Sequence, residues 1–515
     1  MCALTARPPK TKLTPTSQAA APRPARLYPS LYQVNTRVLL TTLSSQLGRP
    51  ATLDDVPDTE LDHIAANGFD WVWFLGVWQT GTAGRSVSLR NPEWRHEFEN
   101  LLANFCDDDV CGSCFAITSY SVHSDFGGNA ALDRLRERIH QRGLRLLLDF
   151  VPNHMAPDHP WARQHPDYFV HGTEAQLERE PQNYARFQTP SGSAVLAYGR
   201  DPYFSGWPDT LQLNYANPEL QEAMARELET IATMCDGVRC DMAMLILPDV
   251  FERTWGRRPA DFWPTAIARA RARAPGFVFM AEVYWDLEWT LQQQGFDYTY
   301  DKRLYDRLRE GHARPVRDHF RADMDFQRRS ARFLENHDEP RAATDFAPAI
   351  HRAAAVLSFL SPGLRFIHQG QIDGFTRRIP VHLNRGPAEP VDRELREFYE
   401  RLLRCIHHPA AQAQWQLLDA AAAWDGNWTW DGFICFAWRS QDDQPLLVVV
   451  NYAPNQAQCY LRLPLEELRG KSVLLQDLMG SNTYERQGDD LLSQGLYLDL
   501  PPWGYHVFEL RAGSR

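Results

Sequence analysis

The chain has 515 residues, of which 44% are apolar and 23% charged, and it carries a formal net charge of −11 at pH 7. This length is more than one ordinary core accommodates, so it predicts two or three domains, with room for a barrel of about 250 residues. The acidic balance argues against nucleic acid and anionic membranes as partners, because both bind basic surfaces.

The first 27 residues are rich in Pro, Ser, Thr and Ala and lack the apolar segment of a secretion signal. We therefore predict a disordered tail over residues 1–27. No apolar run approaches the roughly 18 residues that cross a membrane, so no membrane span is expected. A cytoplasmic location follows by default.

Between about residues 30 and 370, strand-like apolar runs alternate with amphipathic helical segments. The runs cover residues 31–40, 68–78, 144–150, 236–241, 277–282, 331–338 and 362–371. The clearest helical segments cover residues 129–143, 217–237 and 261–276, the second with Asn217 as N-cap and Pro218 after it. This alternation predicts right-handed βαβ units and a parallel sheet.

An open doubly wound sheet would give the same alternation as a closed barrel. The number of units and the absence of a G-x-G-x-x-G motif favour an α/β fold with an eight-stranded (β/α)8 TIM barrel, formed by residues 28–154 and 211–412. The connection after the third barrel strand is too long for a loop, so we predict a small inserted domain over residues 155–210. Short β-type runs separated by turn residues predict an all-β C-terminal sandwich over residues 413–515.

The stretch "CDDDVCGSC" holds Cys106, Cys111 and Cys114. Its C-x4-C-x2-C spacing occurs in some iron–sulfur proteins, with a fourth cysteine elsewhere. Free thiols in a loop are the favoured interpretation, and a disulfide framework is not expected in a large cytoplasmic chain.

Charged and polar side chains follow four of the predicted strands. Because a barrel places the carboxyl ends of its strands on one rim, these side chains are expected to converge. They are Asp149, Asn153, His154, Arg239, Asp241, Glu282, His337 and Asp338.

This set of residue types suits glycoside chemistry with retention. One carboxylate acts as nucleophile and a second, protonated carboxyl as acid, about 5–5.5 Å apart, and their different surroundings separate their pKa values. Arg239 and Asp241 lie on the same face of one strand, so Arg239 is placed to orient Asp241. The competing interpretation, that each carboxylate caps a helix, is reasonable for any one of them but not for the ordered set.

The stretches "DFVPNH", "GVRCD", "FMAE" and "FLENHD" resemble, in order and spacing, the four signature segments of the α-amylase family of glycoside hydrolases (family 13). "LQLNYANP", residues 211–218, resembles a further short motif of that family's inserted domain, and the resemblance extends over nearly all of the chain after residue 28. It implies that Asp241 is the nucleophile, Glu282 the general acid/base and Asp338 the third catalytic carboxylate.

The same resemblance implies that His154, Arg239 and His337 contact the sugar ring. Asn153 would be structural, or a ligand in calcium-binding members, and Asp149 would organise the rim.

Two departures from the family pattern affect the cofactor and substrate predictions. Met244 and Leu245 stand where many members have a basic pair that serves a calcium site and a further sugar subsite, so no metal site is predicted and Ca2+ is only weakly supported. Phe115 stands where a Tyr commonly stacks on the reacting sugar, and Tyr120 falls at a second substrate-binding position. Among the aromatic residues, Trp78, Trp207 and Trp285 are further candidates for sugar stacking.

These observations predict a retaining hydrolase that cleaves α-glucosidic bonds in malto-oligosaccharides or α-glucans. The alternative is an α-glucan transglycosylase, such as a glucanotransferase, a branching enzyme or a disaccharide isomerase, which uses the same carboxylates. A catalytically inactive glycan-binding protein belongs to another class, and the presence of all three carboxylates argues against it. The oligomeric state stays open.

Overall fold

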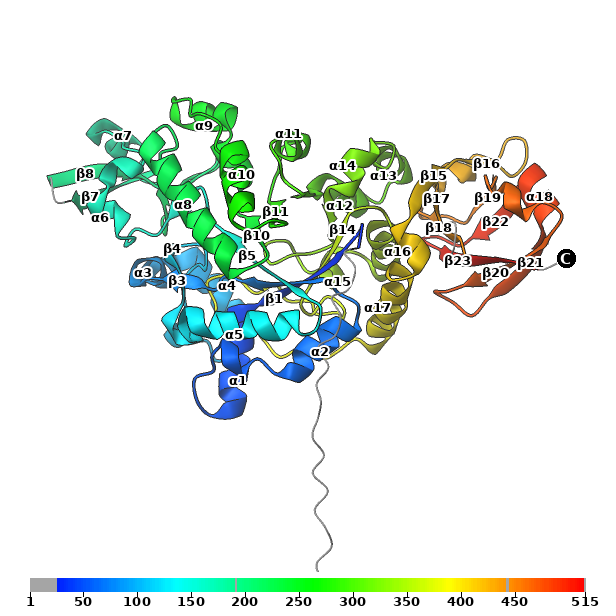
Figure 1. Ribbon diagram of the computed structural model, residues 1–515, viewed down its shortest axis with the longest axis horizontal. Helices are drawn as coiled ribbons and strands as arrows, with labels where there is room; N and C mark the ends of the chain where they lie inside the picture. Colours follow the sequence, from blue (N-terminus) through cyan, green and yellow to red (C-terminus); the bar gives the residue numbers. More distant parts are fainter. Residues whose placement is uncertain (1–25, 190–191, 441–443, 514–515) are drawn as a thin grey trace, which may run out of the picture.

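The computed structural model describes residues 26–189, 192–440 and 444–513. A central barrel lies between a projecting β-hairpin at one end and an antiparallel β-domain at the other (Figure 1). The predicted tail, residues 1–27, lies outside the described residues except for Arg26 and Leu27.

Eight parallel strands close into the barrel, which confirms the predicted fold class. Their order around it is β1-β14-β13-β12-β11-β10-β5-β2. They are β1 (Ser30–Asn35), β2 (Trp71–Leu75), β5 (Arg145–Phe150), β10 (Gly237–Cys240), β11 (Val278–Ala281), β12 (Tyr298–Tyr300), β13 (Ser330–Arg332) and β14 (Leu364–His368).

Two predicted strands are wrong in their second halves, and the run over residues 331–338 is a strand only to Arg332. The apolar run over residues 31–40 continues as a strand only to Asn35, where helix α1 (Thr36–Leu47) begins. The Asn35 side chain accepts a hydrogen bond from the backbone N–H of Val38 and so caps the helix. Apolar residues continue past Asn35 because α1 buries Leu40 and Leu43 in the same core as the barrel strands.

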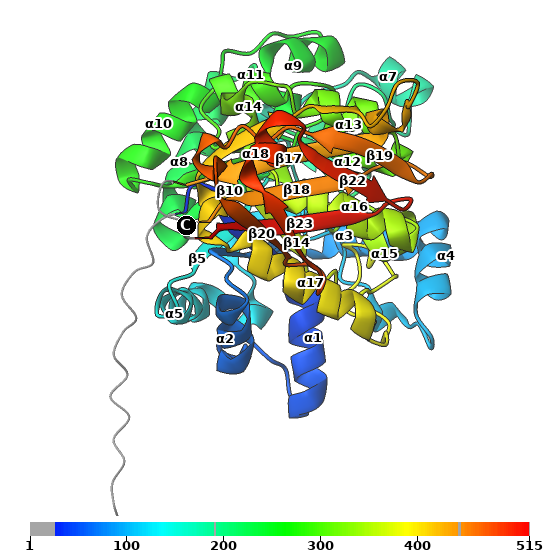
Figure 2. The ribbon, with the colours of Figure 1, turned by 90° about the vertical axis from the view of Figure 1, so that its right-hand side faces the viewer.

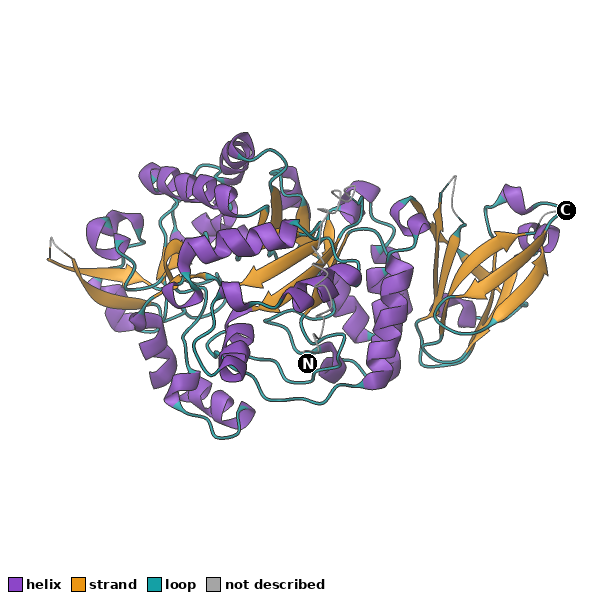
Figure 3. Ribbon diagram, turned by 60° about the horizontal axis from the view of Figure 1, so that its bottom comes forward, coloured by secondary structure: helices purple, strands orange, loops and turns teal. Residues whose placement is uncertain are grey.

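Helices surround the barrel, as Figure 3 shows in purple around the orange strands. The predicted helices form as α5 (Gly128–His140), α8 (Pro218–Met234) and α10 (Trp263–Arg273), and Asn217 caps α8 by accepting from the N–H of Glu219. Other helices are α2 (Asp58–Ala66), α9 (Pro248–Trp255), α11 (Glu288–Gln293), α12 (Lys302–Glu310), α13 (Ala313–His319), α14 (Met324–Arg328), α15 (Ala342–Asp345), α16 (Pro348–Phe359) and α17 (Arg393–Ile406). Within the described ranges, no helix has the length and apolar character to cross a membrane.

Two long connections extend from the carboxyl ends of the barrel strands. The connection after β2 contains β3 (Trp78–Thr80), α3 (Thr82–Arg90), α4 (Pro92–Leu101) and β4 (Ile117–Val122). The connection after β5 contains β6 (His154–Met155), α6 (Trp161–Gln164), α7 (Glu174–Arg179), the hairpin β7 (Tyr184–Thr189) and β8 (Gly192–Ala197), and β9 (Leu211–Gln212). Because β6 pairs with β9, the second excursion starts and ends at the same place. The exact domain boundaries stay a prediction.

The C-terminal part is antiparallel, with a six-stranded sheet, a three-stranded sheet and one short helix, α18 (Gly488–Ser493). In sheet order the first is β15 (Gln414–Leu418), β17 (Phe433–Arg439), β18 (Leu446–Asn451), β23 (Tyr505–Ala512), β20 (Ser472–Asp477) and β21 (Thr483–Gln487). The second is β16 (Ala420–Ala422), β19 (Ala457–Leu461) and β22 (Leu496–Leu500). Trp438 of β17 is fully buried and its Nε1 donates to the carbonyl of Leu360, which joins this domain to the barrel.

Candidate active site

The predicted site residues of β5, β10 and β11 lie side by side because the strand registers align them. Asp149 pairs in register with Arg239, and the next ladder bonds run from the N–H of Asp241 to Phe150 O (2.8 Å) and from the N–H of Glu282 to Cys240 O (3.0 Å). Asp241 and Glu282 therefore each follow the last residue of their strand, at the same height on the rim.

Arg239 connects the two carboxyl groups. Its Nη1 donates to Asp241 Oδ1 at 2.7 Å and its Nη2 to Glu282 Oε2 at 2.7 Å, and its side chain is fully buried. Three aromatic rings surround the guanidinium, those of Trp73, Phe115 and Tyr300, with its Cζ 5.1–5.9 Å from their centroids. One cation thus fixes an oxygen of each carboxyl group in a site from which water is excluded.

Glu282 has two differently bonded oxygens. Oε2 accepts from Arg239 and from the N–H of Met242 (2.7 Å), whereas Oε1 accepts only from the Tyr284 hydroxyl (3.0 Å) among the described residues. Burial raises the pKa of Glu282 to about 8, the negative charge of Asp241 adds to the rise, and Arg239 opposes it. A carboxyl group with this pKa is protonated at neutral pH, and the proton belongs on Oε1 because Oε2 already accepts two hydrogen bonds, whereas Oε1 accepts one.

Asp149 supports the rim from below. Its Oδ2 accepts from the N–H of Gly76 (2.7 Å), and its Oδ1 lies 3.9 Å from Arg239 Nη1. Burial raises the pKa of Asp149 to about 7. Trp78, a predicted stacking residue, is buried and donates from Nε1 to the carbonyl of Asp149 (2.7 Å), so it belongs to this support.

The loop after β13 brings His337 and Asp338 to the same rim. His337 Nε2 lies 3.0 Å from Asp338 Oδ2, and the Gln33 side chain bonds to His337 Nδ1 at 2.9 Å. Burial lowers the pKa of His337 to about 4, so the ring is neutral at pH 7. Phe115 packs against this imidazole with ring centroids 5.5 Å apart.

A cavity of about 360 Å3 opens over these groups. It brings together five of the eight predicted catalytic and substrate-binding residues in its lining: Phe115, His154, Asp241, Glu282 and Asp338. Arg239 and His337 lie directly behind that lining, in contact with Asp241 and Asp338.

Tyr120 is not brought to this cavity. Its ring stacks on Phe150, and its hydroxyl donates to the carbonyl of Val151 and accepts from the N–H of the same residue. Both hydrogen-bonding directions are thus used within the protein. The arrangement gives Tyr120 a structural position and does not support the predicted contact with substrate.

Several lining residues lie outside the eight predicted catalytic and substrate-binding residues. Trp207, which the sequence did suggest, packs edge-on against His154 with centroids 5.4 Å apart. The others are Trp94, Ser113, Asp209, Thr210, Met242, Tyr284 and His382. Tyr284 follows Glu282 by two residues, so period-two spacing could have found it. Trp94 of α4 and His382, after β14, stack with ring centroids 4.3 Å apart, and no local sequence pattern predicts that contact.

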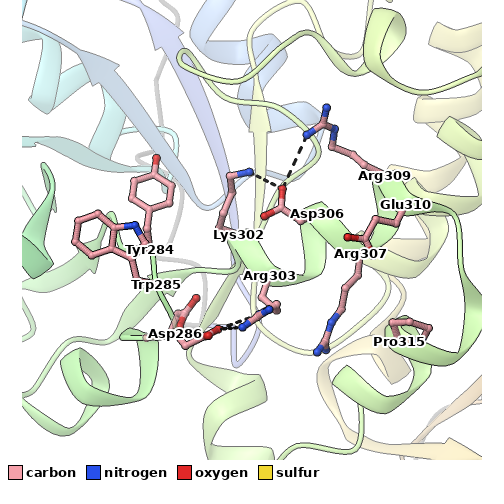
Figure 4. Close-up of a pocket in the computed structure, with 11 residues that line it drawn as sticks. Tyr284, Trp285, Asp286, Lys302, Arg303, Asp306, Arg307, Arg309, Glu310 and Pro315 are labelled. Carbon is pink, nitrogen blue, oxygen red and sulfur yellow. Dashed lines mark hydrogen bonds and ion pairs between the residues drawn. The ribbon is translucent and has the colours of Figure 1, made fainter. Parts of the chain in front are cut away.

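A second cavity of about 690 Å3 adjoins the first, and Tyr284 lines both. Trp285 and Asp286, the third predicted stacking residue and its neighbour, follow Tyr284 with φ values of 64° and 61°. Figure 4 shows Trp285 beside Tyr284, Asp286 paired with Arg303, and the Lys302–Asp306 pair along α12. Positive φ at two successive non-glycine residues is strained, so the contacts of Asp286 with Arg303 and of Trp285 with Tyr203 hold this turn in place.

The surroundings of Asn153 do not fit calcium. Gln212 Nε2 donates to Asn153 Oδ1 at 2.9 Å and to the Asn153 carbonyl at 3.0 Å, so an amide N–H2 faces the oxygens that a cation would need. Met244 and Leu245 are buried. The described residues contain no group of three or more His, Cys, Asp or Glu side chains that could hold a metal ion.

The predicted cysteine cluster is made of free thiols with different surroundings. Cys106 is exposed, Cys111 half-buried and Cys114 buried against Gly76. Burial raises the pKa of Cys114 well above its usual value, so this thiol is unreactive.

Comparison with known families decides the relationship. The family described as alpha amylase, catalytic domain, matches residues 115–386, just over half of the chain. The chain belongs to the α-amylase family. The match begins at Phe115 and includes all three predicted catalytic carboxylates.

Relatives with curated names are more distant. Alpha-amylase 3 of Dictyoglomus thermophilum is 24% identical over 296 residues, which are 53% of this chain and 56% of that protein. The α-1,4-glucan:maltose-1-phosphate maltosyltransferase of Burkholderia pseudomallei is 28% identical over 333 residues, 61% of this chain and 25% of that protein. The chain therefore spans about half or less of the length of these relatives.

Solved structures share the fold over nearly the whole chain. The noncanonic maltogenic α-amylase AmyB of Thermotoga neapolitana has a TM-score of 0.65 at 18% identity, covering 94% of this chain and 99% of its own. The acarbose complex of the α-amylase of Geobacillus thermoleovorans has a TM-score of 0.64 at 18% identity, covering 96% and 100%. At these identities the likeness establishes the architecture alone.

Proposed function

We propose that this α-amylase-family protein is a retaining enzyme that cleaves α-glucosidic bonds in malto-oligosaccharides or α-glucans through a covalent glycosyl–Asp241 intermediate. The observation that carries the proposal is the bridging of Asp241 and Glu282 by the single buried guanidinium of Arg239. A guanidinium that reaches both carboxyl groups favours the close pair of a retaining mechanism over the wider, water-filled gap of an inverting one.

In the first step Asp241 Oδ2 attacks the anomeric carbon. Arg239 holds Oδ1, whereas no described residue donates to Oδ2, so Oδ2 is the available nucleophile. Glu282 Oε1 gives its proton to the glycosidic oxygen as the bond to the leaving group breaks. The leaving group departs with that proton, and the sugar stays esterified to Asp241.

In the second step ionised Glu282 takes a proton from water, whose oxygen attacks the anomeric carbon and releases Asp241. Two inversions give net retention. Asp338 and neutral His337 bind sugar hydroxyls, with His337 donating an N–H from Nε2 because its Nδ1 accepts from the Gln33 amide N–H2. Phe115 supplies an aromatic face to the ring.

The proposal is tested by incubating the protein with maltoheptaose beside the Asp241→Asn variant and resolving product sizes and anomers. Shorter α-anomers from the wild type alone are the expected result. Initial products of inverted, β configuration, or equal turnover by the variant, would rule out a retaining mechanism through Asp241.

The second candidate is glycosyl transfer, in which a sugar hydroxyl replaces water in the second step. The 690 Å3 cavity favours it, because Tyr284 places that cavity on the Glu282 side, where a leaving group or acceptor binds. Trp285 there offers an aromatic face. Products both longer and shorter than maltoheptaose would support transfer, and Trp285→Ala should then lower the ratio of transfer to hydrolysis by about threefold or more, as expected for loss of one aromatic contact.

A further inference from the structure

The C-terminal domain exposes two tryptophans in one short loop. Trp424 and Trp428, between β16 and β17, are 55% and 78% solvent-exposed. Large aromatic side chains are normally mostly buried, so a pair left this far in water marks a contact surface.

The backbone of this loop is fixed from inside. Asn427 is buried, and its Oδ1 accepts from both the N–H and the hydroxyl of Thr429 at 2.9 Å. Its own N–H donates to the carbonyl of Trp424 at 3.1 Å and closes the turn between the two indoles. The Thr429 hydroxyl in turn accepts from the N–H of Gln458 on β19. The backbone that carries the two rings is thus fixed in advance, so a ligand orders only the side chains on binding.

The loop adjoins a polar and aromatic sheet face. On β19 and β22, Tyr460 lies opposite Tyr497 with ring centroids 5.4 Å apart, and Gln458 lies opposite Asp499. Residues between these positions, such as Cys459 and Leu498, point into the core, so the four named side chains share the outward face. Figure 2 looks onto this domain, with β19 and β22 labelled.

The chemistry of the surface selects among possible occupants. Residues 423–432 contain no Lys or Arg, which argues against nucleic acid, anionic lipid and phosphorylated partners. The two tryptophans expose roughly 300 Å2 together, well below the roughly 800 Å2 that each partner buries in a stable protein interface. Flat aromatic faces next to the amide of Gln458 and the carboxylate of Asp499 suit a neutral polyhydroxylated chain, whose pyranose rings have an apolar face and a hydroxyl rim.

We propose that Trp424 and Trp428, with the outward face of β19 and β22, form a non-catalytic binding surface for an α-glucan chain. The choice of α-glucan over another neutral polysaccharide rests on the proposed function of the catalytic pocket. The surface holds polymeric substrate on the enzyme and leaves short oligosaccharides unaffected.

The test is native gel electrophoresis of the full chain in gels with and without amylopectin. The wild type should be retarded, and the Trp424→Ala/Trp428→Ala variant should show an apparent Kd for the polymer raised by about tenfold or more, the cost of losing aromatic anchors. Trp289→Ala is the matched control, because Trp289 on α11 is 47% exposed and lies outside this surface. The control should migrate as the wild type does.

A wild type that is not retarded, or a double variant retarded as strongly as the wild type, would overturn the proposal. An equal loss in the Trp289→Ala control would also overturn it. Turnover of maltoheptaose by the double variant should stay within about twofold of the wild type, since the catalytic pocket is untouched. The gel does not depend on turnover, so retardation without activity refutes the proposed function alone, and activity without retardation refutes the surface alone.

Discussion

The two cavities that share Tyr284 differ in how far their charged side chains are exposed to water. In the catalytic cavity the Arg239 side chain is fully buried between two carboxyl groups and three aromatic rings. In the neighbouring cavity the ion pair of Arg303 with Asp286 leaves 48% and 65% of the two side chains in water. Arginine therefore pairs with acidic side chains at both cavities, shielded from water in one and exposed to water in the other.

This difference explains why Asp241 and Glu282 around Arg239 are better suited to acid–base chemistry than the Asp286–Arg303 pair. Water screens the exposed pair, and such pairs contribute about 0–1 kcal/mol. The buried cluster has no such screening, and burial there raises the pKa of Glu282 into the neutral range. We therefore expect mutations at the catalytic cavity to have larger effects than comparable mutations at the neighbouring cavity.

The largest effect is expected for Arg239→Met. Removing the cation leaves the Asp241 carboxylate buried without compensation, which costs about 3–5 kcal/mol of unfolding free energy. Turnover should fall by at least about a thousandfold, because neither carboxyl group keeps its orientation. Urea unfolding and initial rates on malto-oligosaccharides measure both. A stability loss under about 1 kcal/mol would show that the cluster is not as dry as its burial indicates.

The next effect concerns the pH dependence of Glu282. The wild-type rate should fall as pH rises through about 8, because the acid loses its proton there. Glu282→Gln should lower the rate by about 10²–10⁴-fold and remove this alkaline limb. The measurement is the rate as a function of pH. The Arg303→Met control should keep the alkaline limb. An unchanged limb in Glu282→Gln would assign the acid to another group.

The same pKa shift has a consequence for stability. Between the usual glutamate pKa of about 4.5 and the folded value of about 8, the folded protein binds a proton that the unfolded chain has released. The contribution of Glu282 to the free energy of unfolding therefore declines as pH rises across that range. Comparing the pH dependence of urea unfolding in the wild type and Glu282→Gln isolates this contribution, and the decline should be weaker in the variant.

A smaller effect is expected for Tyr284→Phe in the wall between the cavities. The variant loses a hydroxyl that donates to Glu282 Oε1, so the ionised carboxylate loses stabilisation and the alkaline limb should move to higher pH. Loss of the hydrogen bond should cost about 0.5–1.5 kcal/mol of stability. A limb that moves to lower pH would mean that Tyr284 accepts the proton of Glu282 instead of donating its own.

The sequence predicted the catalytic cavity much better than the neighbouring one. Asp241, Glu282 and Asp338 follow or end short local stretches, and barrel geometry brings such ends together whatever the loops do. Phe115 and His154 were predicted from the same kind of local motif, and the structure places both in the lining.

The features that the sequence did not predict correctly depend on packing or on segments too short to carry a local pattern. Trp94 and His382 come from two excursions, after β2 and after β14, that meet only in three dimensions. Strand β12 is three residues long, too short to give a periodic signal. Tyr120 was placed by position in a motif, but the choice between the pocket and Val151 depends on packing that the motif does not encode.

The charged residues of the second cavity could not be predicted from the sequence for a similar reason. Lys302, Arg303 and Asp306 lie together on α12, and charged residues on a helix usually form only its solvated face. These residues line a cavity because the turn at Trp285 and Asp286 lies opposite them. No sequence pattern predicts the positive φ values of that turn.

The smallest effect is expected for Arg303→Met, the exposed counterpart of Arg239→Met. The substitution removes the partner of Asp286 but leaves that carboxylate in water, so stability should change by no more than about 1 kcal/mol. Turnover of maltoheptaose should change by less than about threefold, and the product spectrum should shift only if the turn at Trp285 relaxes. Measured beside Arg239→Met, it compares the loss of a buried guanidinium that bonds to two carboxyl groups with the loss of an exposed one that pairs with Asp286. Equal losses in both would mean that Arg303, too, is held dry, and that the second cavity belongs to the catalytic centre.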